Sequence, residues 1–328
     1  MNMYNFLRMA AQRGNCAMPI LSFPAVKRLN VSVGELVHSA ELQAKAIVTI
    51  AKETPTIAAV SLMDLSVEAE AFGAKVKFSD DEVPAVIESV VDIDTNPIVL
   101  KLPTLAEGRA QLCIEAIRQA KQRIENKPVF AGMIGPFSLA GRLMDVTEIM
   151  YICYDEPEKV HEVLKVCNEY LVNYAMALIE AGADGIVVAE PLAGVLSPAM
   201  AKEFSHCYIE EIIKAVQDEE HALIYHNCGN SVPMMLDDIF EMHAAAYHFG
   251  NASDMQMVLE KAPDSCICMG NIDPVSRFVQ GTPAEMKVCV KSLIEKCGKY
   301  KNFILSSGCD IPAKASWDNI NAFFDAIE

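Results

Sequence analysis

Short apolar runs rich in β-forming residues alternate with amphipathic stretches along most of the chain. The runs are Pro19–Phe23, Ile57–Leu62, Val129–Ile134, Gly185–Glu190, Ala222–Tyr225, Ala245–Phe249, Cys266–Met269 and Phe303–Ser306. Val160–Glu180 and Ser197–Gln217, which lie between them, carry apolar residues at helical spacing. Alternating strands and helices predict a parallel sheet. Eight strands in roughly 300 residues predict an α/β fold closed into a (β/α)8 TIM barrel.

The main irregularity is the long segment 65–128 between the second and third predicted strands. It contains a predicted hairpin, with a strand at Ala74–Phe78 and a turn at Ser79–Glu82, and then a helix near residues 106–124. We expect this insertion to form a lid or an extra layer over the barrel mouth. Residues 1–328 are therefore predicted to form one domain.

Composition argues against several classes of function. The net charge of −17 disfavours binding to the phosphates of nucleic acids. The sequence has no apolar run of the length that spans a membrane, and residues 1–15 resemble a first helix more than a signal peptide. Eleven scattered cysteines do not suggest a disulfide framework and favour a reducing compartment. We expect a cytoplasmic protein.

Polar and metal-binding side chains gather after the predicted strands, where barrel enzymes carry their reactive groups. These residues are Asp64, Glu190, His226, Cys228, His248, Asn271, Asp273, Cys309 and Asp310. Their positions predict that they lie around one mouth of the barrel, although they are far apart in the sequence.

His226, Cys228 and Cys309 form a candidate zinc site within this set. His226 and Cys228 are two residues apart in an extended segment, so both side chains point to the same side. Cys309 follows the last predicted strand, which barrel closure brings near the fifth. Two thiolates and one imidazole suit zinc, and three protein ligands leave a fourth position for substrate, as in catalytic sites. The competing interpretation is that an HxC pair arose by chance and that these cysteines are core residues.

Several stretches resemble the methylcobamide:coenzyme M methyltransferases, corrinoid-dependent enzymes of the uroporphyrinogen decarboxylase superfamily. The matching stretches span residues 63 to 310 and are Met63–Ala74, Gly135–Gly141, Glu180–Pro191, Leu196–Pro198, His226–Asn230 and Ser306–Asp310. The resemblance implies that His226, Cys228 and Cys309 bind a Zn²⁺ ion that activates a thiol. It also implies a methylated corrinoid, as methylcobalamin or on a corrinoid protein, as the methyl donor.

The same resemblance bears on three further residues. Asp64 falls where the decarboxylase has its key aspartate, and we interpret it as a pocket residue with an altered role. Glu190 is expected to orient substrate or a zinc ligand, or else to be a solvated loop carboxylate. Some relatives have an exchangeable carboxylate ligand near the sixth strand, where this chain has His248, which could be a fourth zinc ligand, a substrate contact or a structural histidine. Asn227 and Asp310 could hydrogen-bond to the ligands.

The sequence departs from the decarboxylase itself near the N-terminus. Ile20–Asn30 lacks the arginine-rich motif that would anchor the acidic side chains of a porphyrinogen. The basic residues that could instead hold a sulfonate are Lys27, Arg28 and Arg142. An apolar rim for the corrinoid could comprise Phe23, Met63, Phe137 and Leu192, although ordinary core packing would explain them as well.

The sequence leaves several functions open. The favoured one is methyl transfer from a corrinoid to a thiol such as coenzyme M, within one-carbon metabolism or methanogenesis. Alternatives are demethylation of a methylated or methoxylated substrate, tetrahydrofolate as acceptor, a binding protein without catalysis, and tetrapyrrole decarboxylation. The oligomeric state is not predicted.

Overall fold

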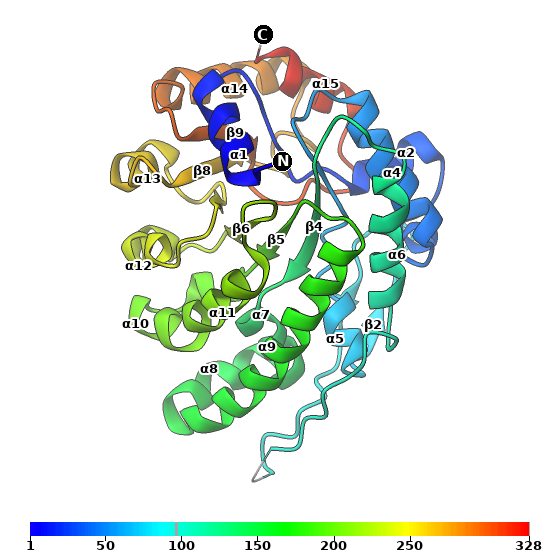
Figure 1. Cartoon of the computed structure of the whole chain (residues 1–328), viewed down its shortest axis with the longest axis vertical. Coiled ribbons are helices and arrows are strands. Elements are labelled where there is room, and N and C mark those ends of the chain that lie inside the picture. The colour runs from blue at the N-terminus through cyan, green and yellow to red at the C-terminus, as the bar shows by residue number, and fades with distance from the viewer. Residues whose placement is uncertain (96–97, 328) are drawn as a thin grey trace.

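A curled, all-parallel sheet of seven strands forms the centre of the molecule (Figure 1). The computed structural model describes residues 1–95 and 98–327. The strands follow one another in the order β1-β4-β5-β6-β7-β8-β9, each hydrogen-bonded to the next. Their bounds are β1 Ala59–Val60, β4 Val129–Ile134, β5 Gly185–Ala189, β6 Ala222–Asn227, β7 Ala246–Phe249, β8 Ile267–Ile272 and β9 Phe303–Ser307. These strands confirm seven of the eight predicted runs.

Helices surround the sheet on its outer side (Figure 1). The longest, α9, begins with Pro157 at its first position, and the Ser197 side chain caps α10 by accepting a hydrogen bond from the Met200 N–H. The helices are α1 Met3–Arg13, α2 Val26–Leu29, α3 Val33–Val37, α4 Ala40–Glu53, α5 Val67–Ala71, α6 Ala110–Lys121, α7 Pro136–Met144, α8 Val146–Asp155, α9 Pro157–Glu180, α10 Pro198–Ala201, α11 Cys207–Val216, α12 Leu236–Glu241, α13 Met255–Lys261, α14 Pro283–Cys297 and α15 Trp317–Asp325. Among the described residues, no helix is long and apolar enough to span a membrane.

The predicted first strand, Pro19–Phe23, is wrong. Pro19 and Pro24 lack the N–H groups that a central strand donates, and Phe23–Ala25 forms a 3₁₀ helix instead. The chain just before it still bridges the two edges of the sheet. The Met18 N–H donates to the Leu305 carbonyl of β9, and the Ile57 N–H, just before β1, donates to the Ala17 carbonyl, each at 3.0 Å.

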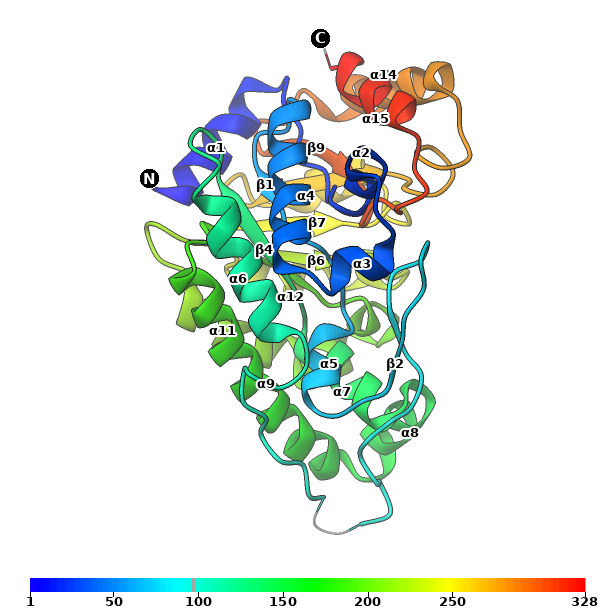
Figure 2. The ribbon, with the colours of Figure 1, turned by 90° about the vertical axis from the view of Figure 1, so that its right-hand side faces the viewer.

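The segment 65–128 contains the predicted hairpin and helix. Strands β2 (Val76–Lys77) and β3 (Ala85–Val86) pair antiparallel, and α6 forms within the predicted helix. Figure 2 shows α6 beside α4, against which it packs.

A buried ion pair joins this inserted segment to the end of β1. Arg109 donates to the Asp64 carboxylate at 2.5 Å and to the Glu70 carboxylate at 2.6 Å. Its third contact is the Ser66 hydroxyl, which itself donates to Asp64 at 2.6 Å. The Arg109 and Asp64 side chains are only 6% and 3% exposed, so each charge depends on the other.

A second buried carboxylate, Glu68 on α5, reaches the end of β4. One of its oxygens accepts a hydrogen bond from the Ile134 N–H at 3.0 Å. The other oxygen, Oε2, is buried and has no hydrogen-bond partner within the described ranges. Burial raises the pKa of Glu68 from 4.5 to about 7, although the bond to Ile134 opposes the change.

Replacing Arg109 with methionine should lower the free energy of unfolding by about 3–5 kcal/mol, because it leaves the Asp64 carboxylate buried without its partner. Urea unfolding of the purified variant measures this change. Arg118→Met is the matched control, since Arg118 pairs with Glu115 at an exposed site where both side chains are at least 40% exposed. Equal effects of the two substitutions would contradict a special role for the buried pair.

Glu68→Gln should change how stability depends on pH. A carboxyl whose pKa is raised in the folded state stabilises the fold below its unfolded pKa and loses that contribution as pH rises through about 7. The variant should therefore gain stability relative to the wild type between pH 4.5 and 8. The gain should be on the order of 3 kcal/mol, since one pKa unit corresponds to about 1.4 kcal/mol. Urea unfolding at several pH values tests this, and a pH-independent difference would contradict it.

Candidate functional site

His226, Cys228 and Cys309 lie together at the carboxyl edge of the sheet. His226 is the second-to-last residue of β6, Cys228 follows that strand, and Cys309 lies two residues beyond β9. Their ligand atoms all lie within 4.8 Å of one another. The Cys309 Sγ lies 3.5 Å from the His226 Nε2 and 3.9 Å from the Cys228 Sγ. The strand-end positions therefore bring together the three side chains that were predicted to form one site.

These separations fit a zinc ion with tetrahedral coordination. Zinc–sulfur bonds of about 2.3 Å and a zinc–nitrogen bond of about 2.0 Å place two sulfurs roughly 3.8 Å apart and a sulfur and a nitrogen roughly 3.5 Å apart. The spacings that involve Cys309 match both values. His226 is 2% exposed, whereas Cys228 and Cys309 are half-buried. The imidazole is thus fixed in the core, whereas the two cysteines are partly exposed.

The two thiols behave as one acid–base pair. A hydrogen bond from Cys309 and the neighbouring His226 lower the pKa of Cys228 below that of an ordinary thiol. The same hydrogen bond, together with burial, raises the pKa of Cys309. The pair thus gives up its first proton readily and its second reluctantly, so binding of a divalent cation would release the second proton.

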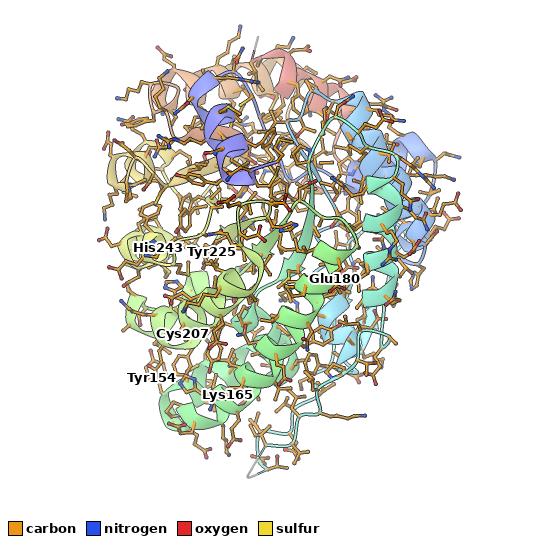
Figure 3. The ribbon with its side chains drawn as sticks, viewed as in Figure 1. Tyr154, Lys165, Glu180, Cys207, Tyr225 and His243 are labelled. Atoms are coloured by element: carbon orange, nitrogen blue, oxygen red, sulfur yellow. The ribbon has the colours of Figure 1, made fainter. Side chains whose placement is uncertain are left out.

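Close backbone packing holds the loop that carries Cys228. A Cβ atom on Gly250 would lie 2.5 Å from the Cys228 Cα, so only glycine fits beside it. Asn227 donates to the Tyr225 hydroxyl of β6 (Figure 3) at 2.9 Å and accepts from the Gly229 N–H at 3.0 Å. Asn227 thus fixes the turn after β6. Cys207, by contrast, is an exposed thiol on α11 (Figure 3).

His248 lies beside His226 but outside the group of three possible ligands. The two residues are paired in register on β7 and β6, and their Nδ1 atoms are 2.8 Å apart. The His248 Nε2 lies 2.7 Å from the Ser306 hydroxyl. Both ring nitrogens of His248 therefore already have protein partners, as expected of a structural histidine.

Glu190 follows β5 and binds the first turn of α7. Its two carboxylate oxygens accept hydrogen bonds from the Phe137 N–H at 3.0 Å and the Ser138 N–H at 2.6 Å. The side chain is fully buried, which raises its pKa to about 7. A solvated loop carboxylate is therefore excluded, and the observed contacts are those of a residue that anchors α7.

Asp64 and Asp310 are carboxylates near the same edge. Asp64 is engaged by Arg109 and Ser66, a network that strand-end positions could not reveal because Arg109 lies 45 residues away. Asp310 follows Cys309, and its Oδ1 is buried without a hydrogen-bond partner within the described part of the chain. Burial raises the pKa of Asp310 well above its ordinary value.

The predicted apolar rim residues differ in burial, and the basic candidates differ in their contacts. Phe23, Met63 and Phe137 are buried core residues, whereas Leu192 is partly buried. The basic candidates are Lys27, Arg28 and Arg142. The Lys27 ammonium donates to two backbone carbonyls of residues 314 and 315, each at 2.9 Å.

Arg28 and Arg142 differ in how fully they are engaged. Arg28 pairs with Glu53 at 3.0 Å and stacks on Trp317. Arg142 contacts the Ser138 carbonyl at 3.3 Å, and burial lowers its pKa. Spare donors therefore do not separate the three basic candidates, and Arg142 differs from the other two in that burial disfavours its charged form.

An open cleft of about 720 Å³ lies between the end of β8 and α14. It borders the site through Asn251, whose side chain would lie 2.9 Å from a Cβ on Gly308, next to Cys309. Its lining combines carboxylate, cationic and apolar side chains, among them Asp273, Arg277, Val288, Leu293 and Lys296. The cleft has room for a small molecule, but His226, Cys228 and Cys309 are not among its lining residues.

Known enzymes of two kinds are similar to this chain in sequence. A methylcobamide:CoM methyltransferase from Methanosarcina acetivorans is 28% identical over 272 residues, which cover 81% of this chain and 77% of that protein. A uroporphyrinogen decarboxylase from Hydrogenovibrio crunogenus is 22% identical over 321 residues, covering 93% and 88%. The similar proteins are enzymes with two different activities, so similarity alone does not choose between them.

A solved protein structure shares this fold. The structure of a methyltransferase from Methanosarcina mazei superposes with a TM-score of 0.85 at 22% identity and covers 98% of this chain and 97% of that one. The family model described as uroporphyrinogen decarboxylase (URO-D) matches residues 15–328. The chain therefore belongs to the uroporphyrinogen decarboxylase family.

Proposed function

We propose that this enzyme transfers a methyl group from a methylated corrinoid, free or on a corrinoid protein, to a small thiol such as coenzyme M. In this reaction a carbon–sulfur bond forms as the cobalt–carbon bond breaks, and the electron pair of that bond stays on cobalt. The observation that carries the proposal is the cluster of His226, Cys228 and Cys309, whose spacing fits zinc with one position open. The similarity to methylcobamide:CoM methyltransferases supports it.

The chemistry required is activation of a thiol that is mostly protonated at neutral pH. A zinc ion held by the three side chains would bind the acceptor as a thiolate and displace its proton. Cys228 and Cys309, as thiolates, add negative charge that keeps the acceptor sulfur electron-rich. The His226 ring offers its nitrogen in a fixed position, because the ring is buried where β6 pairs with β7.

We propose supporting roles for the surrounding residues. Glu190 positions α7, and Asp64 ties the inserted segment 65–128 to the barrel mouth through Arg109. The segment would then act as a lid-like insertion within a single domain of residues 1–328. The cleft beside Asn251 is the proposed route for the thiol. A cytoplasmic location agrees with the free thiols that the site requires.

The purified protein should hold about one zinc ion per chain, and Cys309→Ala and His226→Ala should each lose most of it. Elemental analysis after gel filtration measures the content. Cys207→Ala is the matched control, because this exposed thiol lies on α11 outside the cluster and should leave the zinc content unchanged. Zinc-free wild-type protein that still turns over, or Cys309→Ala with full zinc content, would contradict the proposed site.

The zinc-loaded enzyme should demethylate methylcobalamin in the presence of coenzyme M. Loss of the cobalt–methyl absorbance reports the reaction, and Cys309→Ala should slow it by at least about 100-fold, more than the loss of an outer hydrogen bond would. Cys207→Ala should retain the wild-type rate. Homocysteine and tetrahydrofolate are the comparison acceptors, and turnover with tetrahydrofolate alone would overturn the thiol proposal. Failure with all three acceptors would overturn the proposed direction of transfer.

A further inference from the structure

We propose that His248 and Ser306 fix the tautomer of His226, so that the lone pair of its Nε2 faces the metal position. In this role His248 is a positioning residue and not a fourth ligand. The inference deepens the proposed zinc site and rests on it. It follows from a chain of hydrogen bonds whose directions can be derived one at a time.

The first direction is set by a backbone carbonyl, which can only accept hydrogen bonds. The Ser306 Oγ lies 2.7 Å from the Met18 carbonyl oxygen, so the single hydroxyl hydrogen of Ser306 points there. The Ser306 oxygen must then accept in its contact with the His248 Nε2, also 2.7 Å long. The proton of a neutral His248 ring is therefore on Nε2.

The second direction follows from the first. A neutral imidazole with its proton on Nε2 has a lone pair on Nδ1. This lone pair faces the His226 Nδ1 at 2.8 Å, so His226 must donate from Nδ1. The His248 carbonyl oxygen, 3.2 Å from the same His226 Nδ1, requires the same direction independently. Both contacts leave the His226 Nε2 without a proton and 3.5 Å from the Cys309 Sγ.

The fixed tautomer matters because a neutral imidazole offers one lone pair. With the proton on Nε2, His226 would point an N–H at the sulfurs and could not bind zinc through that atom. The parallel register of β6 and β7, which pairs His226 with His248, makes the contact part of the sheet. The two rings meet edge to face with centroids 4.7 Å apart, so packing also fixes the plane of the ligand ring.

Another buried histidine shows that this arrangement is specific. His206 is 2% exposed, close to the 1% of His248, but neither of its ring nitrogens has a hydrogen-bond partner within the described ranges. His206 is held by packing, including an edge contact with Tyr225. It therefore serves as a matched control for losing a buried imidazole.

Nitrogen-15 NMR of the zinc-loaded, histidine-labelled protein, without corrinoid or thiol, tests the tautomers in the unaltered chain. We expect His226 to be metal-bound through Nε2 with its proton on Nδ1, and His248 to be neutral with its proton on Nε2. A proton on the His248 Nδ1, or a metal-bound nitrogen in His248, would overturn the proposal. Because no substitution is needed to read out the tautomers, the result does not depend on whether a variant folds.

Zinc affinity, measured by competition with a chelator, tests the energetic consequence. His248→Phe removes the nearer of the two acceptors for the His226 Nδ1 proton and leaves only the backbone carbonyl of residue 248, at 3.2 Å. It should weaken zinc binding by about 10-fold. His248→Asn, which keeps an oxygen near the Nδ1 position, should recover part of the loss. Ser306→Ala should cause a smaller loss, because the His248 ring remains but its tautomer is no longer fixed. His206→Phe should bind zinc as the wild type does.

The outcomes separate this inference from the proposed function. Wild-type affinity in both His248→Phe and Ser306→Ala would overturn the positioning role while leaving the zinc site and methyl transfer intact. Weakened zinc binding in these variants, with no methyl transfer by the zinc-loaded wild type, would support the positioning role and overturn the function. Cobalt(II) substitution adds a second readout, since the sulfur-to-cobalt absorption should persist in saturated His248→Phe. Loss of that absorption would indicate a collapsed site and count against a purely positioning role.

Discussion

The parallel register of neighbouring strands is the constraint on which the site depends. His226 on β6 pairs with Ala189 at the end of β5 on one side and with His248 of β7 on the other. On the far side of the sheet, Ile272 pairs with Ser307, two residues before Cys309. Because all strands point the same way, residues 83 positions apart reach one edge. No local segment could assemble these ligands alone.

The buried carboxylates near that edge are determined by the partners that each of them needs. Asp64, Glu68 and Glu190 each have a buried carboxylate, which would be costly without partners. Glu190 gains two backbone N–H groups from the start of α7, where the helix also favours negative charge. Asp64 gains Arg109, whereas Glu68 satisfies one oxygen and retains a raised pKa. These carboxylates connect α7, α5 and the inserted segment to the strand ends.

The sequence was informative wherever a local pattern determines position. Seven strands and the hairpin near Val76 follow from patterns within a few residues. The grouping of His226, Cys228 and Cys309 required one further step, the common edge of a parallel sheet. Pro19–Phe23 was wrong because its composition suits a strand, whereas two nearby prolines remove donors that a strand needs.

Roles that depend on a distant partner were beyond the same reasoning. Glu190 was expected to orient substrate or a zinc ligand, or to be a solvated loop carboxylate, but its partners lie 53 and 52 residues earlier in the chain. No sequence pattern near Arg109 indicates that it pairs with Asp64. Spacing alone left three roles open for His248 and did not indicate that Ser306 and His226 contact its two ring nitrogens.

The contrast between His226 and His248 shows how a fold can give two adjacent imidazoles different tasks. Both are almost completely buried and both are at the same level of the sheet. His248 has its two nitrogens occupied by neighbours on β6 and β9, so its lone pair is used within the protein. His226 has its Nδ1 in contact with His248, and its Nε2 faces the Cys309 sulfur at 3.5 Å. The contact on one imidazole nitrogen of His226 thus determines which nitrogen faces the sulfurs, and the proposed zinc site rests on that choice.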